Sequence, residues 1–89
     1  MTGFKELIGK EVVLDTNTRF LYVGTLIKWN KESVILEKAD VFDQEKSMKS
    51  RDLHLLEALK GGINYNRHCV RVMVSSIVSV SLLSEVREF

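Results

Sequence analysis

The segment of this sequence best suited to chemistry is Asn64-Tyr65-Asn66-Arg67, which is followed closely by Arg71. A tyrosine ring can stack on a nucleobase, an amide can hydrogen-bond to a base edge, and a guanidinium can bind a phosphate. The segment is therefore a candidate contact for single-stranded nucleic acid. We favour a structural alternative, in which Tyr65 packs on the Leu55 and Leu59 stripe of a preceding helix and Arg67 pairs with an acid such as Glu57.

A second polar segment, Asn30-Lys31-Glu32-Ser33, separates the apolar runs of "VGTLIKWNKESVILE" (residues 23–37). A short polar tip between two apolar runs of alternating side chains is typical of a β-hairpin turn. The same tip could instead present its polar groups to a ligand such as a nucleobase. The residue types alone leave both interpretations open.

The remaining reactive side chains do not form a catalytic or metal-binding pattern. His68 and Cys69 are neighbours in a predicted strand, so their side chains point to opposite faces. His54 lies in a predicted helix without a second metal-binding side chain four residues later. We interpret Cys69 as a small buried hydrophobic residue and Asp40 as a solvated acid near a strand end. We expect no enzyme activity, no metal site and no cofactor.

Two helices and five strands are predicted to position these segments. The first helix is expected to be capped by Thr2, to bury Phe4, Leu7 and Ile8, and to end at Gly9. The strands are predicted at residues 10–14, 19–29, 33–42, 67–74 and 77–83. A second helix is expected between the third and fourth strands, with Ser50 or Asp52 as its cap, an apolar stripe at Leu55, Leu56 and Leu59, and Gly61-Gly62 as its end.

The second predicted strand carries apolar residues on both of its faces. Strict alternation places Leu21 and Trp29 on one face and Tyr22 and Leu26 on the other. Both faces are therefore expected to be partly buried, as in a sheet that curls on itself. Gly24 in the middle of this strand supports a sharp bend, because a residue without a side chain allows close approach of another backbone.

The last predicted strand lacks the features that protect exposed sheet edges. No charged residue occurs from Val72 through Ser84, and the chain contains no proline. Natural proteins usually guard an edge strand with charges, proline, bulges or a covering segment. We therefore expect this edge to pair with another copy of the chain. The predicted interface residues are Val72, Val74, Ile77, Val78, Val80 and Leu82. Alternatively, the strand lies in the centre of the sheet, or the first helix or the insertion covers it within one monomer.

Length and composition indicate one small domain, residues 1–89, with a charged and helical insertion at residues 43–62. The 89 residues include 13 Lys+Arg and 12 Asp+Glu, which give a net charge of +1. Strong phosphate binding by overall charge is thereby excluded, and nucleic acid requires basic groups focused on one face. A single cysteine cannot form an internal disulfide, and no apolar run is long enough to span a membrane. We expect a cytoplasmic protein without membrane or DNA partners.

The order of these elements and three sequence blocks resemble the Sm-like (LSm) family, most closely its bacterial and phage-type members. The blocks are Gly9-Lys10, the segment "VGTLIKWNKESVILE" and the segment "VMVSSIVSVS" (residues 72–81). The resemblance implies a mostly β fold, with a strongly bent five-stranded antiparallel sheet, or small open barrel. It also implies a short N-terminal helix, with the helical insertion between strands 3 and 4. Such sheets join edge to edge into rings that often bind single-stranded RNA around a pore.

The resemblance assigns roles to the tip and to the last block. Ser33 stands where the family usually has a base-contacting asparagine, Asn30 falls near its aspartate, and Lys31 occupies its stacking position. Met73 and Val74 stand where arginine and glycine are usual. A serine hydroxyl discriminates bases less well than an amide, and lysine cannot stack as an aromatic ring does. These departures weaken the case for uridine recognition and favour the hairpin-turn interpretation.

The sequence thus predicts a ring-forming Sm-like homo-oligomer that binds single-stranded RNA or serves as a scaffold in RNA metabolism. The candidate RNA contacts are Asn30, Lys31, Ser33, Tyr65, Asn66 and Arg67. The alternative is an oligomeric structural or protein-interaction module that has lost the RNA site.

Overall fold

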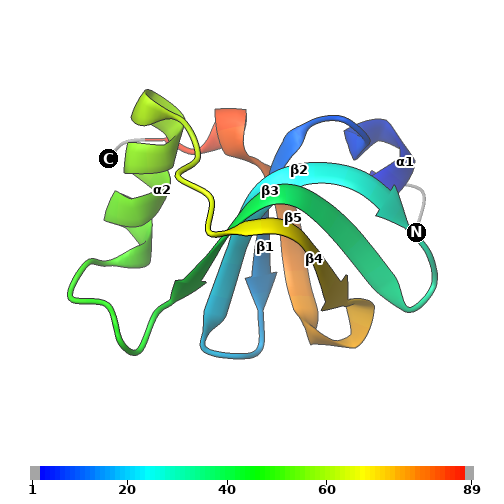
Figure 1. Cartoon of the computed structure of the whole chain (residues 1–89), viewed down its shortest axis with the longest axis horizontal. Coiled ribbons are helices and arrows are strands. Elements are labelled where there is room, and N and C mark those ends of the chain that lie inside the picture. Colours follow the sequence, from blue (N-terminus) through cyan, green and yellow to red (C-terminus); the bar gives the residue numbers. More distant parts are fainter. Residues whose placement is uncertain (1–2, 88–89) are drawn as a thin grey trace.

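The computed structural model describes residues 3–87, which form one five-stranded antiparallel sheet with the strand order β4-β3-β2-β1-β5 (Figure 1). The elements are α1 (Gly3–Leu7), β1 (Glu11–Thr16), β2 (Phe20–Trp29), β3 (Ser33–Asp43), α2 (Arg51–Gly61), β4 (Arg67–Met73), η1 (Val74–Ser76), β5 (Ile77–Leu82) and η2 (Leu83–Glu85). This architecture confirms the predicted fold class, including the helical insertion between the third and fourth strands. Each predicted strand is present, with bounds that differ by at most one or two residues.

The sheet bends so strongly that it buries apolar residues on both faces. The larger cluster lies inside the curved sheet and contains Phe4, Val12, Leu14, Leu26, Val34, Leu36, Ala39 and Val72. The smaller cluster lies under α2 and contains Val13, Leu21, Val23, Phe42, Leu55, Ala58 and Leu83. Figure 1 shows α2 at one end of the molecule and α1 at the other, with the strands between them. The helices therefore cover the two ends of a small open barrel.

Gly24 makes the bend of β2 possible, as the sequence predicts. A Cβ atom built on Gly24 would lie 3.0 Å from the Ala39 Cα and 3.2 Å from the Glu37 carbonyl oxygen of the neighbouring strand. Contacts of this length with backbone atoms cannot be relieved by rotating a side chain. On β3 the same region contains Lys38, a non-glycine residue with a positive φ of 50°. The two strands thus change direction together where they approach most closely.

The strict alternation expected along β2 is wrong at its second half. The pairing of β2 with β3 shifts register between Val23 and Thr25 and again between Leu26 and Lys28. The first shift places the extra residue on β3 and the second places it on β2, and an extra residue moves the side chains that follow it to the other face of its own strand. Trp29 consequently packs on the larger cluster, with its ring 5.7 Å from that of Phe4, instead of sharing a face with Leu21.

The first helix is short and is anchored to β2. Phe4 is buried and Leu7 packs against the larger cluster, whereas Ile8 is exposed, contrary to the predicted stripe. Gly9 has a φ of 83°, and its amide donates to the Leu26 carbonyl at 2.7 Å, so the predicted stop is confirmed. The expected cap, Thr2, lies outside the described residues.

The second helix begins and ends where the sequence predicts. The Ser50 hydroxyl accepts a hydrogen bond from the Leu53 amide at 3.2 Å, and Gly62, with a φ of 87°, follows the last turn. Leu55 and Ala58 are the residues that α2 buries, while Leu59, a member of the predicted stripe, is exposed. None of the helices described over residues 3–87 is long and apolar enough to cross a membrane.

An ion pair closes the turn between β1 and β2 onto the end of β3, and it predicts a pH dependence of stability. The Arg19 Nε donates to the Asp43 Oδ1 at 2.8 Å. This bond, with smaller contributions from the Lys46 and Glu45 amides, lowers the pKa of Asp43 below its ordinary value. A carboxyl whose pKa is lowered by folding contributes stability that is present above its unfolded pKa of about 3.9. The contribution is lost as the pH falls through the lower pKa of the folded state.

Asp43→Asn is therefore expected to lower the melting temperature at neutral pH, and the difference from the native chain should shrink below about pH 4. The measurement is thermal unfolding followed by circular dichroism across the acid range. Glu6→Gln, which removes an exposed carboxylate from α1, is the matched control. A difference between the Asp43 variant and the native chain that is the same at all pH values would contradict this assignment.

Candidate nucleic-acid interface

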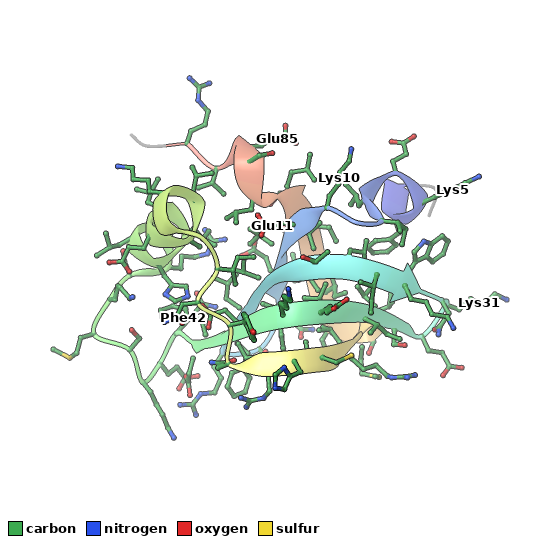
Figure 2. All side chains as sticks on the ribbon, turned by 45° about the horizontal axis from the view of Figure 1, so that its top comes forward. Lys5, Lys10, Glu11, Lys31, Phe42 and Glu85 are labelled. Atoms are coloured by element: carbon green, nitrogen blue, oxygen red, sulfur yellow. The ribbon has the colours of Figure 1, made fainter. Side chains whose placement is uncertain are left out.

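The tip between β2 and β3 is a hydrogen-bonded turn. The Asn30 Oδ1 accepts from the Glu32 amide at 2.8 Å and from the Ser33 amide at 2.9 Å, while the Asn30 amide donates to the Ser33 carbonyl at 2.9 Å. An asparagine that bonds its own backbone in this way stabilises a tight turn. Ser33 is only 2% exposed, so its hydroxyl is not presented to solvent. Of the three predicted contacts in the tip, Lys31 is the one that extends outward (Figure 2).

The structure brings the tip next to the end of β4, where the resemblance places the second half of the family's RNA site. Ser33 is the cross-strand partner of Met73, and the Val74 amide donates to the Glu32 carbonyl at 2.8 Å. Met73 is 45% exposed, and Val74 packs against the larger cluster. The position is therefore formed by apolar side chains, without the cation that the family's arginine supplies.

The other candidate segment lies at the opposite end of β4. Arg67 is the partner of Ala39, and the Asn66 amide donates to the Ala39 carbonyl at 3.0 Å. Ala39 lies six positions after Ser33 on β3, a distance of about 20 Å along an extended strand. The predicted contacts thus form two separate groups within one chain, one at the tip and one beside α2.

Asn66 has a structural role, whereas its neighbours are available for contacts. The Asn66 side chain bonds both backbone groups of Val41, accepting from its amide at 3.0 Å and donating to its carbonyl at 3.1 Å. Tyr65 is 43% exposed, and its ring centroid lies 6.0 Å from that of His68. The exposed Arg67 donates to the Asn66 carbonyl at 3.0 Å.

The structural alternative for this segment is wrong. Glu57 pairs with Lys49 and not with Arg67. The Lys49 Nζ lies 2.6 Å from the Glu57 Oε1. Tyr65 is exposed, so it is not buried against the predicted leucine stripe of α2.

The outer face of β4 carries a row of exposed side chains. Cys69, Arg71 and Met73 alternate with Val70 and Val72, which face the core, whereas Arg67 and His68 at the start of the strand are both exposed. The interpretation of Cys69 as buried is therefore wrong: its position alternates correctly with the core residues, but this face of β4 is open. Arg71 pairs with Ile35, and Ile35 in turn pairs with Lys28 on β2. Basic side chains from two strands thus share one face of the sheet.

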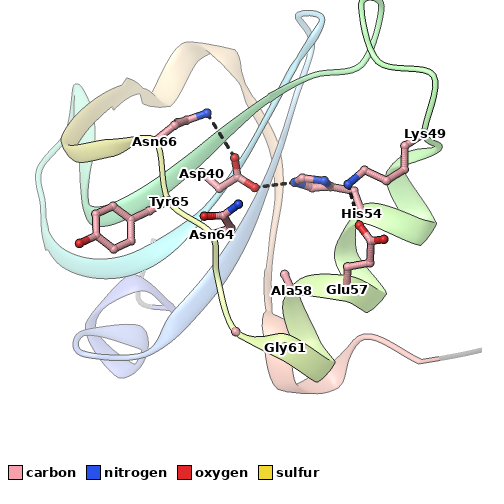
Figure 3. Close-up of a pocket in the computed structure, with 10 residues that line it drawn as sticks. Asp40, Lys49, His54, Glu57, Ala58, Gly61, Asn64, Tyr65 and Asn66 are labelled. Atoms are coloured by element: carbon pink, nitrogen blue, oxygen red, sulfur yellow. Dashed lines mark hydrogen bonds and ion pairs between the residues drawn. The ribbon is translucent and has the colours of Figure 1, made fainter.

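A polar cavity of about 440 Å³ lies between α2 and the start of β4 (Figure 3). At its base the His54 Nε2 and the Asp40 Oδ2 are 2.5 Å apart, and the His54 ring stacks on Phe42 with centroids 3.9 Å apart. Asp40 is 7% exposed, so its interpretation as a solvated acid is wrong. The cavity is also lined by Lys49, Glu57, Ala58, Gly61, Gly62, Asn64, Tyr65 and Asn66.

The His54–Asp40 contact joins residues that are fourteen positions apart, on α2 and β3. Spacing rules for short motifs do not detect such a pair. Within residues 3–87, no group of three or more His, Cys, Asp or Glu side chains is arranged to hold a metal ion.

The two outer strands of the sheet, β4 and β5, each pair on one side only among the described residues. Of the predicted interface residues, Val78 is 70% exposed and lies where the β1–β5 register shifts. Val74, Ile77, Val80 and Leu82 are partly buried against the larger cluster. Val72 is 3% exposed, so it can contribute only its backbone to an intermolecular contact.

Comparison with known proteins gives no match to a protein-family model and no match among curated protein sequences. The fold, however, matches that of the Sm protein of Pyrococcus abyssii, solved in complex with a uridine heptamer. The TM-score is 0.62 at 13% sequence identity, over 90% of this chain and 92% of that one. The chain has an Sm-like fold.

Chains of similar fold occur in two structures of the NatC complex. One, bound to CoA, matches with a TM-score of 0.60 at 13% identity, over 92% of this chain and 86% of that one. The other, bound to Gag peptide and CoA, matches with a TM-score of 0.57 at 13% identity, over 88% and 87% of the two chains. Identities this low establish a shared fold and no shared activity.

Proposed function

We propose that this Sm-like protein forms a closed ring and that the ring binds single-stranded RNA. The observation that carries the proposal is the strand order, which leaves β4 and β5 at opposite edges of one bent sheet without partners among residues 3–87. Unpaired edge strands recruit other strands, and β5 contains no charged residue that would prevent this. Pairing β4 of one copy with β5 of the next is a head-to-tail contact, which produces a ring when the rotation closes.

The basic face of β4 and the tip support RNA as the ligand. A ring would repeat Lys31, Arg67 and Arg71 once in every copy, which compensates for a net charge of only +1 per chain. Several weak contacts to one flexible strand raise the overall affinity without any single strong site. The uridine heptamer bound to the Pyrococcus abyssii Sm protein supports single-stranded RNA as the class of ligand.

Lys31→Ala is expected to weaken the binding of single-stranded RNA by about tenfold or more at low salt, because each copy loses one phosphate contact. Fluorescence anisotropy with labelled oligonucleotides, repeated over a range of salt concentrations, measures both the affinity and the salt slope. Lys46→Ala, which removes an exposed lysine from the loop before α2, is the control and should bind as the native chain does. Equal binding by the two variants would argue against an RNA contact at the tip.

A protein-interaction module is the second candidate function. It is favoured by the turn-forming role of Asn30, the burial of Ser33 and the apolar pair Met73-Val74, which together leave the tip without base-recognising groups. The chains of similar fold in the NatC complex show that this fold also occurs within a protein complex. An absence of RNA binding at low salt, together with a specific protein partner, would favour this candidate.

A further inference from the structure

The cavity beside α2 has the dimensions of a small-molecule site. Its volume of about 440 Å³ falls within the range of roughly 300–1,000 Å³ that is usual for ligand pockets. The walls come from β3, from α2 and from the segment that joins α2 to β4 (Figure 3). It is therefore a feature of the insertion, distinct from the tip at the far end of the sheet.

The interior of the cavity is rich in hydrogen-bond acceptors. Asp40 contributes a buried carboxylate, whereas the carboxylate of Glu57 is exposed and is paired with the Lys49 ammonium group. The Asp40 Oδ1 has only a long contact with the Asn66 Nδ2, at 3.4 Å compared with about 2.9 Å for a typical bond. This oxygen therefore retains the capacity to accept a further hydrogen bond.

The His54 imidazole adds an acceptor that is not satisfied. If its Nε2–H donates to Asp40, the Nδ1 atom carries a lone pair, and no partner for Nδ1 occurs among residues 3–87. A buried polar contact between a helix and a strand usually stabilises less than an apolar one of the same size. The Nδ1 atom is itself fully buried, so it is an unpaired polar group in the cavity wall and not a contact for a ligand. Unpaired buried polar groups are found at functional sites more often than elsewhere.

The rim of the cavity carries aromatic rings and a cation instead of carboxylates. Tyr65 provides an exposed aromatic face, with the His68 ring nearby. Arg67 is fixed next to the rim by its bond to the Asn66 carbonyl. An acceptor-rich interior beneath an aromatic and cationic rim suits a ligand with hydrogen-bond donors at one end and a phosphate at the other.

We propose that this cavity binds a nucleobase with an exocyclic amino group, namely adenine, cytosine or guanine, in preference to uracil. The amino group would donate to the carboxylate of Asp40 and to the amide oxygen of Asn64, while Tyr65 stacks on the ring and Arg67 meets the phosphate. Uracil presents two carbonyl acceptors and one N–H, which fit an acceptor-rich interior poorly. Where the base belongs to an RNA strand, this inference rests on the proposed function, and a free mononucleotide offers the same chemistry.

The test is titration calorimetry of the full chain with AMP, CMP and UMP, and with short homopolymers of A, C and U. AMP and CMP are expected to bind about tenfold more tightly than UMP. Asn64→Ala and Tyr65→Leu change exposed residues of the cavity, and each is expected to weaken AMP binding by about tenfold. Asn17→Ala, at an exposed asparagine in the β1–β2 turn, is the control and should bind as the native chain does. Amide shifts of Gly61 and Gly62 in NMR spectra locate the ligand.

The outcomes separate this inference from the proposed function. Equal affinity for UMP and AMP, or AMP binding that is unchanged by both cavity variants, overturns the nucleobase site. If homopolymers bind without base preference, and if their binding depends on Lys31 but not on Asn64, the nucleobase site is overturned. The proposal of an RNA-binding ring then remains intact. AMP binding that requires Asn64, with no binding of any homopolymer, supports the site and overturns the RNA function. No binding of either kind overturns both.

Discussion

Val78→Lys is expected to prevent the proposed ring from assembling while leaving the fold of the single chain intact. The Val78 side chain is 70% exposed in the isolated chain, so a lysine costs the monomer little. In a ring built on β5 the same position lies against a neighbouring copy, where the ammonium group would be buried without a partner. Such a charge costs about 3 kcal/mol or more at each contact, which weakens association about 100-fold.

Light scattering coupled to size-exclusion chromatography measures this effect directly. Met48→Lys is the matched control, because Met48 is fully exposed on the loop before α2 and lies away from both sheet edges. The control should elute with the mass of the native assembly. A Val78→Lys variant that retains that mass would show that β5 is not at the interface.

Gly24→Val is expected to be the most destabilising single substitution outside the large core residues. Even the Cβ atom of the new side chain would approach the Ala39 Cα to 3.0 Å, and the neighbouring atoms are backbone that cannot move independently. Overpacking of this kind costs about 3 kcal/mol, a large part of the roughly 5–15 kcal/mol that stabilises a small domain. The sheet would have to open at its sharpest bend.

Urea denaturation of the native and variant chains tests this expectation through the free energy of unfolding. Gly61→Ala serves as the control, since a Cβ atom at Gly61 meets nothing within 4 Å and alanine favours the helix. It should be neutral or slightly stabilising. Equal stability of the Gly24→Val and native chains would contradict the close approach of β2 and β3.

The local signals of the sequence located the elements well. Gly9 and Gly62 adopt positive φ at the helix ends, and Ser50 caps α2, because these residue types have strong conformational preferences of their own. Gly24 likewise marks the bend, since a missing side chain is visible in the sequence.

Positions that depend on bulges were not predictable in the same way. The register shift after Leu26 moved Trp29 to the opposite face of β2, and on β3 the positive φ of Lys38 precedes Ala39 and Asp40, which are both buried. A bulge results from how two strands fit together, so one strand's own sequence does not show it. The His54–Asp40 pair depends on this fit, and the sequence analysis therefore missed it.

The candidate site was predicted in part. Residues with short-range roles, such as the turn-forming Asn30, follow from their neighbours in sequence. The exposure of Tyr65 and Cys69 depends on how the inserted helix packs, because α2 covers the end of the barrel and leaves the outer face of β4 open. The cavity is formed by the same packing, which no periodicity in the sequence specifies.

Native mass spectrometry of the full chain at micromolar concentration, combined with hydrogen exchange of the β4 and β5 amides, tests the central claim most directly. We expect one closed assembly of several identical subunits, in which the outward amides of both edge strands exchange slowly and become fast when dilution separates the copies. A single-copy species whose edge amides are already protected would contradict the ring and with it the proposed mode of RNA binding.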